Sequence, residues 1–91
     1  MPSLFKFRGL VIYFWAMENA EPVHVHVGRG VPSAGATKIW LTRTGGCIVA
    51  NNASGLNKRE LADVCEFVIA NHDEICDRWA DFFHGDMSFY K

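Results

Sequence analysis

The sequence has no excess of positive charge. Nine Lys and Arg residues are balanced by ten Asp and Glu residues, which gives a formal net charge of −1 over 91 residues. A protein that binds nucleic acid without sequence preference usually carries a strong basic excess, because neutralised phosphates supply most of its affinity. Any RNA contact would need a local basic patch, so the overall charge does not indicate RNA as a partner.

Cysteines and long apolar runs are also few. Cys47, Cys65 and Cys76 form an odd set without a CxxC motif, which argues against a disulfide framework and favours a reducing compartment. The apolar run of residues 10–17 is too short to span a bilayer, and no signal-peptide cleavage site follows it. We therefore expect a cytoplasmic protein with no membrane partner, folded as a single domain over residues 1–91.

The sequence motifs of the common catalytic sites are missing. No serine lies in a GxSxG elbow, and no Cys–His pair has a recognisable context. The "GRG" at 28–30 has too few glycines, and no following helix, for a phosphate-binding loop. No cofactor is predicted.

The first half of the chain shows the two-residue periodicity of β-strands. "LFKFR" alternates apolar and charged residues, and "LVIYFWAM" is typical of a strand covered on both faces. "VHVHV" puts three valines on one face and two histidines on the other, and Gly45-Gly46 indicates a tight hairpin. Five strand-like segments follow one another: residues 4–8, 10–17, 23–27, 36–41 and 47–50.

The back half has the period of a helix. Asn57 and Glu60 form a capping-box start, and Gly85 is a natural helix stop. One straight helix over this span would be about 40 Å long, which exceeds the roughly 30 Å diameter of a domain this size. The pair Asn71 and Glu74 therefore predicts a break. The apolar stripe comprises Leu61, Val64, Cys65, Val68, His72, Ile75, Cys76, Trp79, Phe82 and Phe83.

Together these patterns predict an α+β fold. We expect an antiparallel meander of four to five strands, packed on one face by a C-terminal bent helix or helix pair. The valines of "VHVHV" should face the helices.

His24 and His26 project from the same strand face, with Cβ atoms roughly 7 Å apart. His-x-His pairs occur in zinc and iron sites, but a site needs a third protein ligand. The available donors are Glu18, Glu21, Cys47, His72 and His84. The sequence places none of them beside the histidines, so no metal is predicted, and His24 and His26 are only weak candidates. The two histidines could equally be polar residues on the outward face of an amphipathic strand, or part of a ligand or anion site.

The same face should carry further side chains. If the strand at 36–41 pairs beside "VHVHV", then Lys38 and Trp40 lie next to the histidines, and Tyr13 and Trp15 join them in some registers. An open face of this kind could stack a base and contact a phosphate, or it could be a protein–protein surface. The interpretation that we favour is packing or a protein interface. The predicted binding residues are His24, His26, Arg29, Lys38 and Trp40.

A catalytic reading of these residues is a rival hypothesis. His24 and His26 could act as acid and base in a metal-independent ribonuclease, with Lys38 or Arg29 holding the phosphate. The catalytic candidates are therefore His24, His26 and Lys38, and whether the protein is an enzyme stays open.

Several segments resemble one family of small proteins over nearly the whole chain. They are "MPSLFKFRGLVIYFWAMEN", "EPVHVHVG", "PSAGATKIWL" and "ICDRWADFFHGD", and they are similar to the bacterial proteins of domain-of-unknown-function family 4160. The most specific elements are Pro22-x-His24-x-His26, the following "TKIWL", and a late Trp79-x-x-Phe82-Phe83. Many relatives read Pro-Pro-His at the motif, whereas this chain has valine at position 23.

The resemblance implies a cytoplasmic bacterial protein whose activity is not established. Such proteins are often encoded beside another small domain, in a layout resembling toxin–antitoxin pairs. The leading hypothesis is therefore an interaction module that binds a small protein encoded nearby through the exposed face around His24, His26, Lys38 and Trp40. The alternatives are an RNA-cleaving toxin, a metal-binding enzyme or a simple homo-oligomer.

Overall fold

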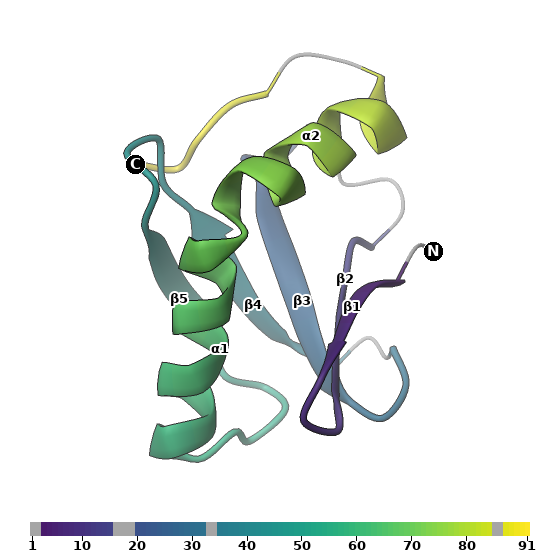
Figure 1. Cartoon of the computed structure of the whole chain (residues 1–91), viewed down its shortest axis with the longest axis vertical. Helices are drawn as coiled ribbons and strands as arrows, with labels where there is room; N and C mark the ends of the chain where they lie inside the picture. Colours follow the sequence, from purple (N-terminus) through teal and green to yellow (C-terminus); the bar gives the residue numbers. More distant parts are fainter. Residues whose placement is uncertain (1–2, 16–19, 33–34, 85–86) are drawn as a thin grey trace.

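A computed structural model of the chain describes residues 3–15, 20–32, 35–84 and 87–91. Five strands form one antiparallel sheet in the order β1-β2-β3-β4-β5, and two helices follow (Figure 1). The predicted α+β fold, with an antiparallel meander and a C-terminal helix pair, is confirmed. The elements are β1 (Ser3–Phe7), β2 (Leu10–Tyr13), β3 (His24–Arg29), β4 (Thr37–Leu41), β5 (Cys47–Asn51), α1 (Lys58–Ala70) and α2 (His72–Phe83).

The sheet begins with a tight hairpin. Phe7 of β1 pairs with Leu10 of β2, so only Arg8 and Gly9 form the turn. Both residues have positive φ angles, 51° and 79°, which is the backbone of a type I′ turn and matches the twist of the flanking strands. Glycine adopts this conformation without strain, which explains why Gly9 separates two apolar segments.

Strand β2 is an inner strand, as its apolar composition predicts. All four of its residues are buried, and it pairs with β1 on one side and β3 on the other. The predicted strand ran to Met17, which is too long: β2 ends at Tyr13, and Phe14 and Trp15 continue the chain outside the strand. The last two residues of the predicted strand lie outside the described ranges.

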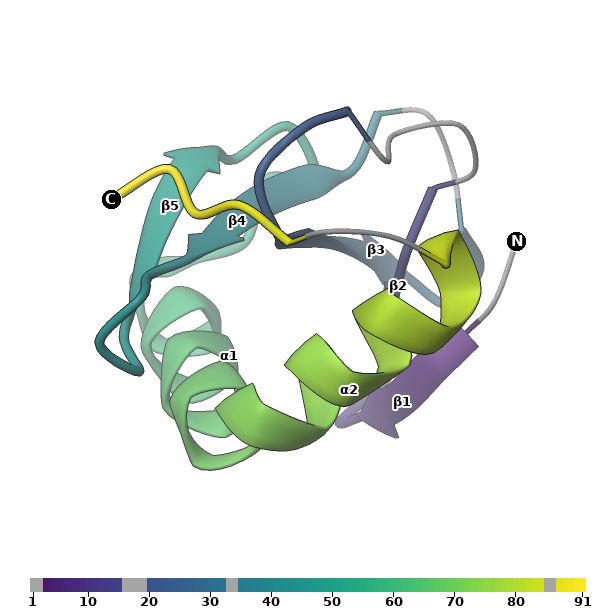
Figure 2. The same cartoon turned by 90° about the horizontal axis from the view of Figure 1, so that it is seen from above.

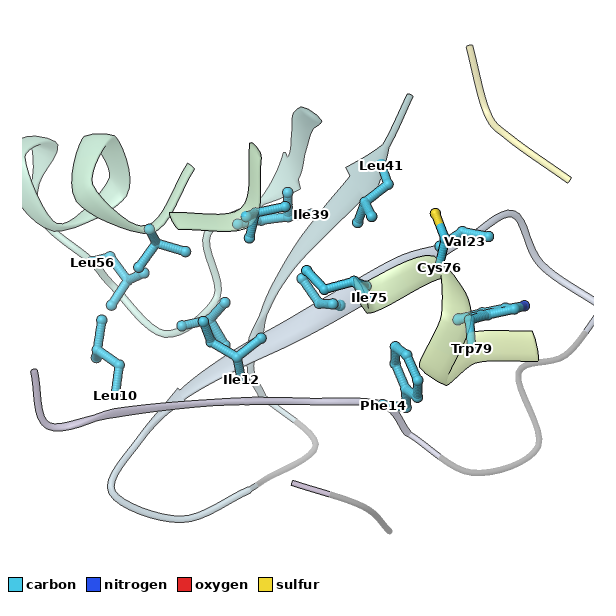
Figure 3. Close-up of a cluster of buried hydrophobic side chains, with 14 residues drawn as sticks. Leu10, Ile12, Phe14, Val23, Ile39, Leu41, Leu56, Ile75, Cys76 and Trp79 are labelled. Carbon is cyan, nitrogen blue, oxygen red and sulfur yellow. The ribbon is translucent and has the colours of Figure 1, made fainter. Parts of the chain in front are cut away.

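The side of the sheet covered by the helices carries the main hydrophobic core. Val23, Val25 and Val27 are fully buried there, which confirms that the valines of "VHVHV" face the helices. Figure 3 shows side chains of the strands converging on Ile75, Cys76 and Trp79 of α2. The buried members of this core are Leu10, Ile12, Phe14, Val23, Val25, Val27, Ile39, Leu41, Leu56, Val64, Val68, Ile75, Cys76 and Trp79.

Helix α1 begins with the predicted capping box. The Asn57 side chain accepts a hydrogen bond from the Glu60 amide at 2.8 Å, and the Glu60 carboxylate accepts one from the Asn57 amide at 2.9 Å. Two amides of the first helical turn, which have no partner inside the helix, are satisfied in this way.

The predicted break between the helices is confirmed at Asn71, although its mechanism differs from the prediction. The Asn71 side chain makes no capping bond to the start of α2. It donates instead to the Phe67 carbonyl at 2.9 Å and so closes the end of α1. The predicted stop at Gly85 lies outside the described residues, and α2 ends beside His84, which has a left-handed backbone with φ of 53°.

Both helices lie on the same side of the sheet when the molecule is viewed from above (Figure 2). The C-terminal segment, residues 87–91, is drawn in yellow and runs towards the β4–β5 end of the sheet (Figures 1 and 2). No helix among the described residues is both long and apolar enough to cross a membrane.

Candidate interaction surface

The outer face of the sheet, which is the side turned away from the main core, carries two rows of side chains. Residues directly opposite each other on antiparallel strands share a face. One row consists of Tyr13, His26 and Lys38, because His26 pairs with both of the others. The second row consists of His24, Trp40 and Ile48, joined through Trp40. The structure therefore brings together His24, His26, Lys38 and Trp40, as the sequence predicted.

His24 is not exposed on this face, contrary to the expectation of an open surface. Only 1% of the residue is accessible to solvent. Its ring lies edge-on to Trp40, with centroids 5.4 Å apart, and to Trp79 of α2 at 5.3 Å. Strand β3 begins at His24, so the side chain of this first residue reaches helix residues although its sequence position belongs to the outer face. His24 is therefore a buried residue whose ring packs between the sheet and α2.

A hydrogen bond fixes the proton on the His24 ring. Nδ1 of His24 lies 2.8 Å from the Pro22 carbonyl oxygen, two residues earlier in the chain. A carbonyl can only accept a hydrogen bond, so Nδ1 must carry the hydrogen. Pro22 thus contributes to the histidine motif by presenting its carbonyl at the start of β3.

His26 is partly exposed and lies among aromatic rings. Its ring is stacked on Tyr13, with centroids 5.7 Å apart and planes 26° apart, and it meets His24 edge-on at 5.0 Å. Trp15 approaches His26 at 6.4 Å, so both aromatic residues that the sequence left open belong to this face. Tyr13 is itself fully buried.

Tyr13 lies over Gly28, the one residue of β3 without a side chain. A methyl group at Gly28 would lie 3.6 Å from the Tyr13 ring and 3.0 Å from the Val31 carbonyl oxygen. The second of these distances is too short for a carbon atom in ordinary contact. Gly28 is therefore needed for close packing of the outer face.

Lys38 is held by two neighbours on this face. Its Nζ lies 2.5 Å from a carboxylate oxygen of Glu21 and 4.2 Å from the ring centroid of Trp40. The lysine side chain is 19% exposed, so the ion pair is partly shielded from water. Because the carboxylate already balances the ammonium, Lys38 is not a ready phosphate ligand.

Trp40 is covered on one side by the C-terminal segment. The Tyr90 ring stacks on Trp40 with centroids 5.1 Å apart and planes only 10° apart. Backbone bonds hold the segment in place: the Val23 amide donates to the Ser88 carbonyl, and the Arg43 amide donates to the Lys91 carbonyl, both at 2.9 Å. Sequence reasoning missed this segment because residues 87–91 show no period, and the two aromatic residues Phe89 and Tyr90 were the available signal.

Arg29 does not join the histidines, although it was predicted as a binding residue with them. It belongs to the helix side of β3, where its guanidinium binds both carboxylate oxygens of Glu60 at 2.7 and 2.9 Å. It also donates to the Gly55 carbonyl at 3.2 Å. The hydrogen bonds from Arg29 and from the Asn57 amide lower the pKa of Glu60 to about 2, and the same pair raises the pKa of Arg29. Arg29 therefore anchors the start of α1 to the sheet.

The predicted additional metal ligands are dispersed. Glu21 is near the histidine face but is bound to Lys38. Cys47 lies beside Cys65 of α1, and His84 follows α2. Among the described residues, no three His, Cys, Asp or Glu side chains form a group that could hold a metal ion. Glu18 lies outside the described residues.

A Cys–His pair does exist in α2, although no sequence context marks it. The Cys76 sulfur lies 3.8 Å from Nδ1 of His72, whose Nε2 donates to the Thr42 carbonyl at 2.7 Å. Burial raises the pKa of the Cys76 thiol, with Asp73 and Asp77 acting in the same direction. The thiol is therefore protonated and poorly nucleophilic, and the pair serves to fill the core.

A second thiol lies in a different environment. The Cys47 sulfur is 3.8 Å from the Cys65 carbonyl oxygen. A hydrogen bond from the Cys47 thiol lowers the pKa of Cys65 to about 7, and the pKa of Cys47 is raised in return. This contact between β5 and α1 was not predicted, because strand period and helix period are each local to one segment and do not show which residues of two segments meet.

Comparison with known proteins gives one match. Neither the curated proteins nor the solved structures yield a match to this chain. The model of one protein family, described as "Domain of unknown function (DUF4160)", matches residues 9–80. The matched region contains the histidine motif, β2 to β5 and most of the helix pair, and it stops before the C-terminal segment that covers Trp40. The chain belongs to this DUF4160 family.

Proposed function

We propose that this protein is an interaction module that binds a small protein partner through the Trp40 surface. This surface is formed by His26, Lys38, Trp40, Ile48 and Tyr90. Its central feature is the stacked pair of Trp40 and Tyr90, in which Tyr90 remains 60% exposed. Tryptophan and tyrosine are the residues most enriched among those that dominate the binding energy of protein interfaces.

The rigidity of the surface supports the same proposal. The buried His24 ring packs edge-on against Trp40, and the Lys38 ammonium lies over the Trp40 ring. His24 is in turn packed against Trp79 in the core. An aromatic side chain already fixed in its binding orientation loses little conformational entropy on association, which favours a stable complex.

The chemistry of the surface fits a protein better than RNA. Its only lysine is paired with Glu21, and the whole chain carries a formal charge of −1. Single-strand RNA binding normally combines stacking platforms with a positively charged groove. The stacking residues are present, and the positive groove would have to come from elsewhere.

The ribonuclease alternative has less support because of the position of His24. A general acid or base must come within hydrogen-bond reach of the proton that it transfers. His24 is 1% exposed and its Nδ1 is bonded to Pro22. For RNA to reach both histidines, the packing of Trp40 and Trp79 around His24 would have to open.

Co-expression with the product of the adjacent reading frame tests the proposal. The gene layout implied by the resemblance makes that product the first partner to examine, and a toxin–antitoxin-like pair is the specific form of the proposal. The two proteins should co-purify, and Trp40→Ala should weaken the complex about thirtyfold or more, as expected for a dominant interface residue. Phe82→Ala, which removes another partly exposed aromatic residue, from α2, should leave binding unchanged. Separate migration of the two proteins at micromolar concentration would count against the proposal.

The catalytic alternative predicts a different result from the same chain. Expressed alone, it should arrest growth, and the double variant His24→Ala/His26→Ala should relieve the arrest. If the interaction proposal is correct, Trp40→Ala should still weaken binding of the partner when the purified protein has no nuclease activity.

A further inference from the structure

Strand β5 is an edge strand whose first three residues, Cys47 to Val49, lack the usual protection; its one irregularity follows them, where the pairing with β4 shifts between Ile39 and Lys38. It lies at one end of the strand order, and its sequence, CIVAN, contains no charged residue and no proline. Natural proteins usually protect exposed edges with lysine, proline or bulges, because an open edge pairs readily with another chain. The opposite edge, β1, has both Lys6 and an irregularity between Ser3 and Phe5.

The backbone of β5 has groups directed away from the sheet. The Thr42 amide donates to the Gly46 carbonyl at 2.9 Å. Bonded and non-bonded pairs alternate along an antiparallel ladder, and the pairing of β4 with β5 is regular from Ile39 to Leu41. The amide and carbonyl groups of Cys47 and Val49 therefore point outward, where a further strand would bind.

An apolar flank of α1 lies beside this edge. Leu61, Cys65 and Ile69 are spaced four residues apart and so share one side of the helix. Cys65 contacts Cys47 of β5, which places this side next to the edge. Val49 and Ile69 are 36% and 49% exposed. We name the edge strip as the set Cys47, Ile48, Val49, Leu61, Cys65 and Ile69.

The two ends of the edge strip carry opposite charges. Lys58 lies on the same side of α1 as Ile69, at the N-terminal end of the strip. At the other end, a hollow is lined by Gly45, Ile69, Asp73 and Glu74. The acidic residues of α1 itself, such as Asp63, line hollows beside Arg8 instead.

We propose that the edge strip is a homodimer interface, in which β5 pairs antiparallel with β5 of a second copy about a two-fold axis at Ile48. Cys47 of one copy then faces Val49 of the other, so that the outward backbone groups of both residues pair. Antiparallel docking also places Lys58 of one copy opposite the acidic hollow of the other.

The spacing along α1 agrees with this arrangement. Lys58 and Ile69 are about 16 Å apart on the helix, and the midpoint between them lies near residue 63 or 64. Cys47 contacts Cys65, and Ile48 is about 3.3 Å further along β5 in the direction of Leu61. The middle of the helix flank therefore coincides with Ile48, as a two-fold axis at this residue requires.

The structure also explains why a second copy fits this surface. Each copy presents the same uncharged strip with a basic and an acidic end, so the strip is complementary to itself when it is reversed. Ile48 pairs with Ile48 of the second copy as a non-hydrogen-bonded pair, in which side chains approach most closely. The edge strip shares Ile48 with the Trp40 surface, but the dimer is argued from the edge of β5 and from α1 and needs no partner protein.

Cysteine cross-linking across the axis tests the register. The background variant Cys47→Ala/Cys65→Ala removes the two thiols of the strip. In this background, Ile48→Cys should give a disulfide-linked dimer under mild oxidation, because opposed residues in this geometry satisfy the distance that a disulfide needs. Val31→Cys, which introduces a thiol at a 69% exposed position away from the strip, should form no disulfide-linked dimer. Equal cross-linking of the two variants would overturn the proposed register.

Sedimentation equilibrium tests the interface itself. The unmodified chain should be dimeric at about 100 µM, and Val49→Lys should raise the dissociation constant about tenfold or more, because an unpaired ammonium would be buried. Ile69→Lys should have the same effect, so that the test does not depend on one variant folding. Val31→Lys is the matched control and should not change the dimer. A monomeric unmodified chain at this concentration would overturn the proposal.

Discussion

Replacement of His24 by alanine should destabilise the protein strongly, because His24 is a core residue at the start of β3. The imidazole is almost completely buried and contacts Trp40, Trp79 and His26. Its Nδ1 donates to the Pro22 carbonyl. Alanine would remove the ring, leave a cavity between two tryptophans and leave the Pro22 carbonyl without this partner.

The magnitude follows from these lost contacts. A hydrogen bond contributes about 0.5–1.5 kcal/mol, and a favourable aromatic pair contributes about as much. Truncation of larger aromatic core residues to alanine costs about 3–5 kcal/mol. For the smaller imidazole of His24, we expect the free energy of unfolding to fall by about 2–4 kcal/mol. His26→Ala, which removes a partly exposed ring, should cost about 1 kcal/mol or less.

Urea denaturation monitored by tryptophan fluorescence and by circular dichroism measures both values. His24→Phe is a useful third variant, because it retains most of the packing and loses the hydrogen bond to the Pro22 carbonyl. It should fall between the unmodified protein and His24→Ala. If His24→Ala cost less than His26→Ala, the assignment of His24 to the packed interior would be wrong, and a role in binding or catalysis would regain support.

Three further predictions concern other parts of the fold. The pKa of Glu60 is lowered from about 4.5 to about 2 by Arg29 and the Asn57 amide, so the stability from this carboxylate is complete above pH 4.5 and is lost as the pH falls towards 2. Glu60→Gln should therefore flatten the acid limb of a stability–pH curve, and an unchanged limb would contradict the role of the ion pair. Cys65, whose pKa is lowered to about 7, should be alkylated by iodoacetamide with a midpoint near pH 7 in the Val49→Lys variant, and a midpoint near the ordinary thiol value would refute this. Gly28→Ala should lower the free energy of unfolding by about 1–3 kcal/mol through overpacking against the Val31 carbonyl, as measured by urea denaturation, and a neutral result would show that the backbone moves easily there.

Most of the fold could be predicted from the sequence because local patterns agree with the final structure. Strand period, the glycine turns and the capping box at Asn57 each depend on residues close in the chain. The break at Asn71 was also predictable, since a straight helix would have been too long. The role of its side chain was not, because Asn71 can accept from the following turn or donate to the preceding one.

The candidate site was only partly predictable because burial depends on distant segments. The alternation of "VHVHV" placed the two histidines on the outer face, yet α2 and Trp79 bury His24 from the far end of the chain. Arg29 was grouped with the histidines by proximity in sequence, whereas strand alternation turns it towards Glu60. Tyr90 reaches Trp40 from outside any periodic segment.

The two proposed surfaces would act together in a dimer. A two-fold axis at Ile48 joins the outer faces of both copies into one sheet surface, since Ile48 pairs with Trp40. Two Trp40 surfaces would then lie on the same side of the assembly. A partner with two binding segments could contact both, and the resulting avidity would exceed the affinity of either surface alone.

The central claim is that Trp40 anchors a partner protein, and titration calorimetry with the purified product of the adjacent reading frame tests it most directly. We predict a saturable complex with the unmodified chain, an affinity about thirtyfold weaker or worse for Trp40→Ala, and an unchanged affinity for Phe82→Ala. The circular dichroism spectra of both variants should match that of the unmodified chain. Equal binding by the two variants, or no heat of binding with the unmodified chain at micromolar concentration, would contradict the claim.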